Sequence, residues 1–143
     1  MSLSLAVRAG GLGFVAVVLL LSGGGDPPSA DAQGSPPWVA PESEKAKKNP
    51  VASNAQSIAA GKKLTADKAC TACHGESGKG DGPGAAALNP KPADWTAVPA
   101  SESDGCLFWK VSTGRGAMPP WKDSLSEPER WQLVNYIRSL KKK

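Results

Sequence analysis

Two cysteines and the only histidine of the 143-residue chain lie together in the segment CTACH, which begins at Cys70. Cys73 is three positions further on, and His74 follows it directly. Thiols and imidazoles form covalent bonds and bind metal ions. Three kinds of site therefore fit these residues: a disulfide, a zinc site and a covalently attached haem.

The first two kinds of site fit the rest of the chain poorly. A redox-active disulfide in a CxxC motif usually follows a β-strand, and no strand pattern precedes Cys70. It would also leave His74 without a role. A zinc site would have to combine Cys70, Cys73 and His74 with the third cysteine, Cys106. Neighbouring residues such as Cys73 and His74 point apart in a regular backbone and rarely converge on one small ion.

The order Cys-x-x-Cys-His is the signature of covalent haem attachment. The spacing lets both thiols add to the vinyl groups on one edge of the porphyrin, and the next residue offers its imidazole to the iron. Met118 is the only methionine after Met1 and lies in the proline-rich segment GAMPPW. A lone methionine often fills a gap in a core, but no second histidine competes for the iron. We therefore predict His74 and Met118 as the axial ligands, a pair that raises the reduction potential.

The N-terminal segment is typical of a secretory signal peptide. Arg8 precedes an apolar run at residues 12–21, and the sequence ADA at residues 30–32 fits the small-x-small rule for cleavage. The run is shorter than the roughly 20 residues that cross a bilayer. We expect residues 1–32 to be removed and the protein to be periplasmic, with an uncleaved membrane anchor as the alternative.

Removal of residues 1–32 takes away Arg8, Asp26 and Asp31 and leaves 16 basic and 11 acidic residues, a net charge of +5. This balance favours acidic protein surfaces as partners, and the basic patches typical of nucleic-acid binding are absent. Residues 33–52 are rich in Pro, Ser, Lys and Glu and lack apolar periodicity, which predicts a leader or linker. Its one large apolar residue is Trp38, which either covers the domain surface or is disordered.

Residues 53–143 are predicted to form one mostly helical domain with long loops. A first helix is expected from Ser53 to about residue 69, with Ser53 and Gln56 as a capping box. Gly61 within it indicates that another helix crosses closely. A short helix is expected within residues 102–112, with a strand as the alternative, and a last helix after Ser126. Aliphatic residues are few and tryptophans are frequent, which suggests a large apolar ligand within the core.

Four blocks of sequence follow the order found in class I c-type cytochromes, the small monohaem electron carriers: GKKL; CTACHG with GKGDGPGAAALNPKPADW; DGCLFWKVSTGRGAMPPW; and LSEPERWQLVNYIRSL. The chain resembles this family over about residues 53–140. The resemblance implies an all-α cytochrome c fold, with three to five helices and long loops wrapped around one covalently bound haem c.

The resemblance also implies a role for individual residues. Cys70 and Cys73 would form the thioethers, with His74 and Met118 as the axial iron ligands. The carbonyl of Pro83 would accept a hydrogen bond from the ring of His74 and so orient it. The first and last helices would cross at Gly61 and Tyr136. Cys106 stands where the family is commonly acidic, and we expect a buried thiol there, with an intermolecular disulfide as the alternative.

The function implied is electron transfer rather than catalysis. The protein would carry single electrons in a respiratory chain, from a quinol-oxidising complex or a dehydrogenase to a terminal oxidase or reductase. The alternative is a haem-bearing subunit tethered within a larger membrane or periplasmic oxidoreductase complex. Membrane association would require an uncleaved N-terminus or a partner complex. Four lysines are expected to surround the haem edge and steer acidic partners: Lys79, Lys91, Lys110 and Lys122.

Overall fold

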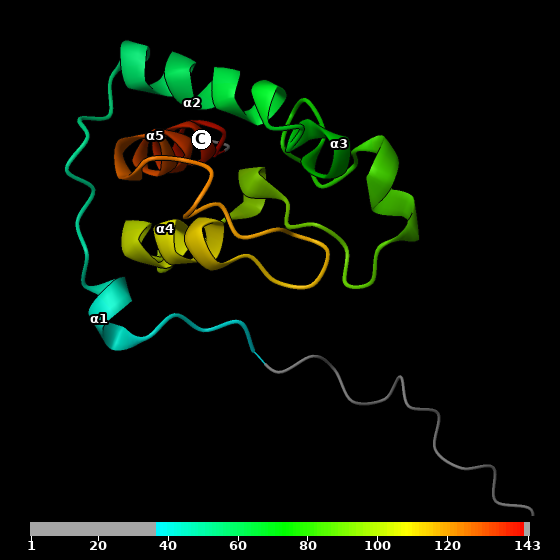
Figure 1. Ribbon diagram of the computed structural model, residues 1–143, viewed down its shortest axis with the longest axis horizontal. Coiled ribbons are helices and arrows are strands. Elements are labelled where there is room, and N and C mark those ends of the chain that lie inside the picture. The colour runs from blue at the N-terminus through cyan, green and yellow to red at the C-terminus, as the bar shows by residue number, and fades with distance from the viewer. Residues whose placement is uncertain (1–36, 142–143) are drawn as a thin grey trace, which may run out of the picture. The chain divides into compact units, whose positions relative to one another are not determined.

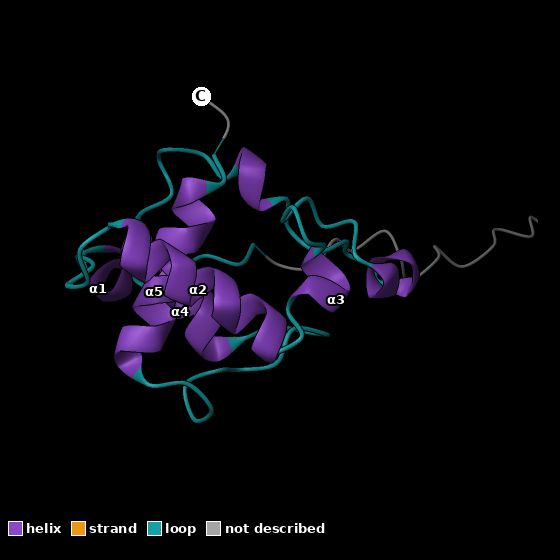
Figure 2. Cartoon of the chain, turned by 90° about the horizontal axis from the view of Figure 1, so that it is seen from above, coloured by secondary structure: helices purple, strands orange, loops and turns teal. Residues whose placement is uncertain are grey.

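The computed structural model describes residues 37–141. The predicted signal peptide lies outside the described residues. Helices and loops make up the described part of the chain, which contains no strand (Figure 2). None of the helices in that part is long and apolar enough to cross a membrane. The predicted all-α fold is confirmed. The helices, in chain order, are α1 (Glu42–Lys45), α2 (Ala55–Asp67), α3 (Thr71–His74), η2 (Pro83–Ala87), η3 (Trp95–Ala97), α4 (Asp104–Thr113) and α5 (Glu127–Ser139).

Helix α5 lies between α2 and α4 and supplies much of the core (Figure 1). It begins after Ser126, whose hydroxyl accepts a hydrogen bond from the Glu129 N–H while the Glu129 carboxylate accepts one from the Ser126 N–H at 2.7 Å. Pro128 suits the first turn because its missing N–H would have had no partner there. The buried residues of α5 are Trp131, Leu133, Val134, Asn135, Tyr136 and Ile137.

Helices α2 and α5 cross at Gly61, as predicted. A Cβ atom placed on Gly61 would lie 2.1 Å from the carbonyl oxygen of Gln132 and 2.8 Å from Cβ of Tyr136. Only glycine lets the two backbones approach this closely. The predicted cap of α2 is wrong by one residue: the Asn54 side chain accepts from the Ser57 N–H at 2.9 Å, and the Ser57 hydroxyl accepts from the Asn54 N–H.

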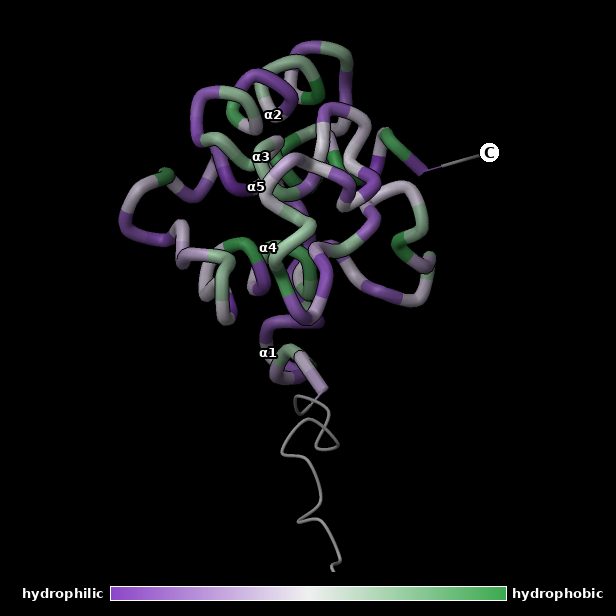
Figure 3. Tube along the Cα trace, turned by 90° about the vertical axis from the view of Figure 1, so that its right-hand side faces the viewer, coloured by the Kyte–Doolittle hydropathy of each residue, from purple (hydrophilic) through white to green (hydrophobic). Residues whose placement is uncertain are grey.

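The apolar cluster at residues 106–111 is a helix, and the alternative of a strand is wrong. Ser103 caps α4 by accepting a hydrogen bond from the Cys106 N–H at 3.2 Å. Phe108 stacks on Trp131 of α5, with ring centroids 4.0 Å apart and an interplanar angle of 16°. This helix carries one of the most hydrophobic stretches of the trace (Figure 3), and its inner face joins the core around α5.

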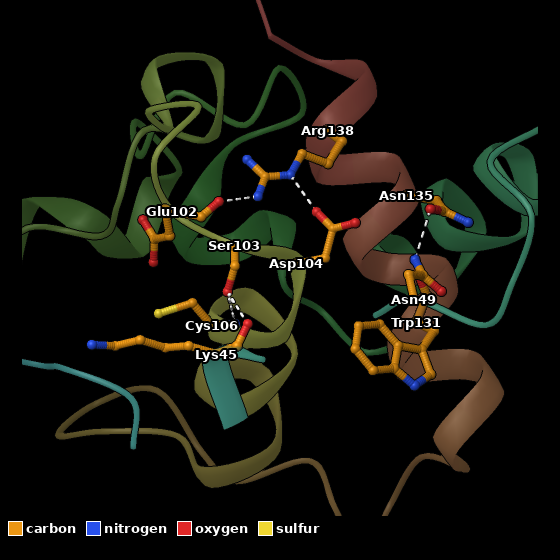
Figure 4. Close-up of polar contacts among 9 residues, drawn as sticks. All are labelled: Lys45, Asn49, Glu102, Ser103, Asp104, Cys106, Trp131, Asn135 and Arg138. Carbon is orange, nitrogen blue, oxygen red and sulfur yellow. Dashed lines mark hydrogen bonds and ion pairs between the residues drawn. The ribbon is translucent and has the colours of Figure 1, made fainter. Parts of the chain in front are cut away.

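Residues 37–52, which we call the N-terminal strap, pack on the helices. Ala40 is only 2% exposed. The Ser103 hydroxyl donates to the Lys45 carbonyl at 2.8 Å, and the Asn49 amide donates to the Asn135 side chain at 2.8 Å (Figure 4). Residues 37–52 of the segment predicted as a leader or linker thus make specific contacts with α4 and α5, and the Trp38 ring lies against Trp109 of α4.

Candidate haem-binding site

The motif residues lie on a single helical turn. Cys70 is the N-cap of α3, and its carbonyl accepts hydrogen bonds from the N–H groups of Cys73 at 3.2 Å and His74 at 2.9 Å. Residues three and four apart in a helix are neighbours on its surface. The turn therefore places Cys70 next to both Cys73 and His74. Both thiols are free and partly exposed, and burial raises the pKa of the Cys70 thiol.

The ring of His74 is held by two contacts. Its Nδ1 lies 3.1 Å from the carbonyl oxygen of Ala93, and the ring stacks on Trp95 with centroids 4.2 Å apart. A carbonyl oxygen can only accept, so Nδ1 carries the proton and Nε2 keeps its lone pair. Burial lowers the pKa of His74, and the Ala93 hydrogen bond partly opposes this shift. A neutral ring with an oriented Nε2 is the form that binds a metal.

The partner of the His74 ring in the structure is Ala93, whereas the resemblance implied Pro83. The backbone N–H of Trp95 donates to the Gly78 carbonyl at 2.7 Å, which brings the segment with Ala93 against the motif. Pro83 also lies near the motif. An added Cβ on the preceding residue, Gly82, would lie 2.5 Å from the carbonyl oxygen of Ala72. The role of orienting the ring is therefore kept, but a different carbonyl performs it.

Met118 lies in a closed turn, part of the segment 114–121 that we call the methionine loop. Its N–H donates to the Arg115 carbonyl at 3.0 Å, and the Arg115 N–H donates to the Met118 carbonyl at 2.8 Å. Met118 is partly buried and packs against the hydrophobic core cluster, as does Cys70. Trp95, which stacks on His74, belongs to the same cluster. The motif and the methionine loop thus border one aromatic-rich apolar cluster, and these residues fit a haem.

The residues that a zinc site would combine do not gather in the described part of the chain. Cys106 is 8% exposed within α4, and no three His, Cys, Asp or Glu side chains of residues 37–141 gather in a way that could hold a metal ion. Burial of Cys106 agrees with the expected buried thiol.

Two of the four lysines expected to steer partners have other contacts. The Lys91 ammonium donates to the carbonyls of Ala85 and Ala86, at 3.0 and 2.8 Å, and so caps η2. The Lys110 ammonium forms an ion pair with Glu102. Charge neutralised or fixed in this way contributes less to long-range attraction. Lys79 and Lys122 are exposed, as is Lys91, whereas Lys110 is partly buried.

An all-α domain with a CxxCH turn, an oriented histidine and a lone methionine at the edge of one apolar cluster defines a c-type cytochrome. The chain matches the family model described as "Cytochrome C oxidase, cbb3-type, subunit III" over residues 56–137, and it belongs to this family of class I c-type cytochrome domains. A domain of this family binds covalently attached haem c, which is the chemistry of electron transfer.

One similar solved structure is a chain of the Kuenenia stuttgartiensis reducing HAO-like protein complex Kustc0457/Kustc0458. The TM-score is 0.59 and the sequence identity 33%. The similarity covers 65% of this chain and 47% of that chain, so this protein spans about half the length of that relative. The search of curated proteins found no match.

Proposed function

We propose that the protein is an exported carrier of single electrons, not itself an enzyme, whose haem iron is ligated by His74 and Met118. The observation that carries this proposal is the turn at residues 70–74, which combines two free thiols with an imidazole whose Nε2 is left for a metal. The methionine loop supports it, because Met118 borders the same core cluster as Cys70.

The bound haem supplies an iron that changes oxidation state by one electron. The protein's part is to hold the two ligands so that they move little when the charge changes. His74 is fixed by Ala93 and Trp95, and Met118 is fixed by the two hydrogen bonds to Arg115. Ligation by a thioether together with an imidazole would raise the reduction potential, which suits a carrier that accepts electrons from a quinol-linked donor.

The proposed location is the periplasm, with residues 1–32 removed or retained as an anchor. A quinol-oxidising complex or a dehydrogenase would reduce the protein, and a terminal oxidase or reductase would oxidise it. Lys79 and Lys122 are the exposed lysines proposed to attract acidic partner surfaces.

A second candidate is a dedicated haem subunit of one larger complex. The family model carries the name of an oxidase subunit, and the similar solved chain is described as part of a complex. The full chain with a C-terminal tag distinguishes the two. A dedicated subunit co-purifies from membranes with larger proteins at fixed stoichiometry, whereas a carrier is recovered alone.

The ligands are tested on protein expressed with a haem-attachment system. We expect the intact mass to increase by one haem that survives acid extraction, and the spectrum to show the methionine–iron charge-transfer band. Cys70→Ser and Cys73→Ser each lose a thioether, whereas the matched control Cys106→Ser keeps both. Met118→Ala loses the charge-transfer band but keeps the haem. A zinc-containing product with no visible spectrum would overturn the proposal.

A further inference from the structure

Trp38, near the start of the N-terminal strap, contacts both α4 and the methionine loop. Its ring centroid lies 6.1 Å from that of Trp109 and 5.5 Å from the Lys110 ammonium, both on α4. The guanidinium carbon of Arg115, in the methionine loop, lies 6.0 Å from the same ring. These distances are those of cation–π contacts. One indole therefore joins α4 to the methionine loop.

Arg115 links this indole to Met118. The two residues exchange both backbone hydrogen bonds, at 2.8 and 3.0 Å, so a displacement of one moves the other. The turn is tight, because Gly114 has a φ of 59° and an added Cβ there would lie 2.4 Å from the carbonyl carbon of Pro119. A Cβ on Gly116 would meet nothing within 4 Å. Arg115 contacts the strap through the ring of Trp38.

The strap is held in place independently of the methionine loop. The Ser103 hydroxyl donates to the Lys45 carbonyl (Figure 4). An added Cβ on Gly105 would lie 2.0 Å from the Glu44 carbonyl oxygen, so strap and helix backbones are in direct contact. Asn49 is bound to Asn135 of α5. Trp38 therefore extends from a fixed support, and it can restrain a loop that it contacts.

We propose that Trp38 is a positioning residue for the distal ligand: it holds Arg115 and, through the Arg115–Met118 hydrogen bonds, keeps Met118 in place. This inference rests on the proposed ligation by His74 and Met118. Loosening the loop would lower the reduction potential, because a weakened thioether bond stabilises ferrous iron less.

Two measurements on the holoprotein test the proposal. The first is hydrogen–deuterium exchange of the Arg115 and Met118 amides, which reports loop opening whether or not Met118 binds iron. The second is the affinity of the ferric protein for added imidazole, which competes with Met118. In Trp38→Ala we expect both amides to exchange about threefold faster and imidazole to bind about threefold tighter, the size of one partly exposed cation–π contact. Trp38→Phe keeps an aromatic face, and in this variant both amide exchange and imidazole affinity should stay close to the wild-type values.

Two controls separate positioning from general loosening. Val39 is 58% exposed, and Val39→Ala should change neither measurement. Asn49→Ala removes only the strap contact farthest from Trp38. The contacts of Lys45 with Ser103 and of Glu44 with Gly105 remain, so the loop amides should be unchanged. Arg115→Gln should reproduce the Trp38→Ala effect, and the double variant should add little to either single one.

Unchanged exchange and imidazole affinity in Trp38→Ala would overturn the proposal, even if the free energy of unfolding fell. Absence of the methionine–iron band in the wild-type protein would instead overturn the ligand assignment, and the exchange data would still decide whether Trp38 holds the loop.

Discussion

The crossing of α2 and α5 gives the sharpest prediction about stability, because Gly61 has no space for a side chain. In Gly61→Ala the new Cβ would lie 2.1 Å from the Gln132 carbonyl oxygen and 2.8 Å from Cβ of Tyr136. The Gln132 oxygen belongs to the backbone and Cβ of Tyr136 is bonded directly to it, so neither atom can rotate away. The helices would have to separate by about 1 Å to restore ordinary contacts, and a close-packed interior resists such a shift.

Two opposing effects determine how far Gly61→Ala changes the free energy of unfolding. Alanine is the better helix former by about 1 kcal/mol. Overpacking costs roughly 1–3 kcal/mol, and here the upper end applies because the contact involves backbone atoms of the partner helix. We therefore expect Gly61→Ala to lower the free energy of unfolding by about 2 kcal/mol.

The assay is guanidinium unfolding of the holoprotein followed by far-UV circular dichroism. Ala59 is exposed on the same helix, so Ala59→Gly measures the propensity effect alone, with an expected loss of about 1 kcal/mol. A Gly61→Ala variant as stable as the wild type, together with the expected loss in Ala59→Gly, would refute the close crossing.

Three further predictions concern α5. Ser126→Ala removes the capping hydroxyl and should lower the free energy of unfolding by about 1 kcal/mol, whereas the exposed control Ser124→Ala should not. Hydrogen bonds from Ser126 lower the pKa of Glu129. These bonds stabilise the folded protein fully at pH values above the ordinary glutamate pKa. The stabilisation is lost as the pH falls through the lowered pKa of Glu129. The Ser126→Ala effect should therefore shrink in acid. Asn135→Ala removes the amide that donates to the part-buried Val51 carbonyl at 3.1 Å and should lower the free energy of unfolding by about 2 kcal/mol; Asn49→Ala, measured by the same unfolding assay, should lower it less.

The helices that the sequence predicted well have strong local signals. Helix α5 combines a capping box, a proline in the first turn and helical apolar spacing, all within residues 126–140, and these signals agree with one another. The start of α2 was wrong by one position because Ser53 and Asn54 are adjacent and both are good capping residues. Only the position of Ser57, whose hydroxyl also donates to the Ala52 carbonyl at 2.7 Å, decides between them.

The contacts of the N-terminal strap could not be predicted because their partners are distant in sequence. Asn49 contacts a residue 86 positions away, and Lys45 contacts one 58 positions away. No apolar periodicity marks the strap, since it is held largely by backbone carbonyls and single side chains. Gly105, against which the strap packs, was the one available signal: a glycine inside the first turn of a helix indicates a close approach.

Some features of the candidate site could likewise be predicted from local sequence, whereas others depend on tertiary contacts. The thiols and imidazole could be predicted because one helical turn brings residues 70, 73 and 74 together, which is a local property. The acceptor for the His74 ring could not, because two carbonyls ten residues apart compete for it. Trp95 decides the outcome, since its ring stacks on His74 and its backbone N–H binds Gly78. An orienting acceptor can therefore be predicted from the chemistry of a ligated imidazole, but its residue number depends on tertiary packing.

The strap and the haem both add stabilising contacts to a domain whose small size limits the apolar surface that it can bury. A haem supplies apolar bulk on the side of the motif. Where the strap packs, the N-cap of α4 and the buried side of α5 carry polar groups that need partners: the Ser103 hydroxyl and the Asn135 amide. The strap provides those partners from its own carbonyls. A segment with the composition of a linker can thus be part of the folded unit, because its backbone groups form hydrogen bonds with the domain. Such bonds need no apolar pattern in the sequence.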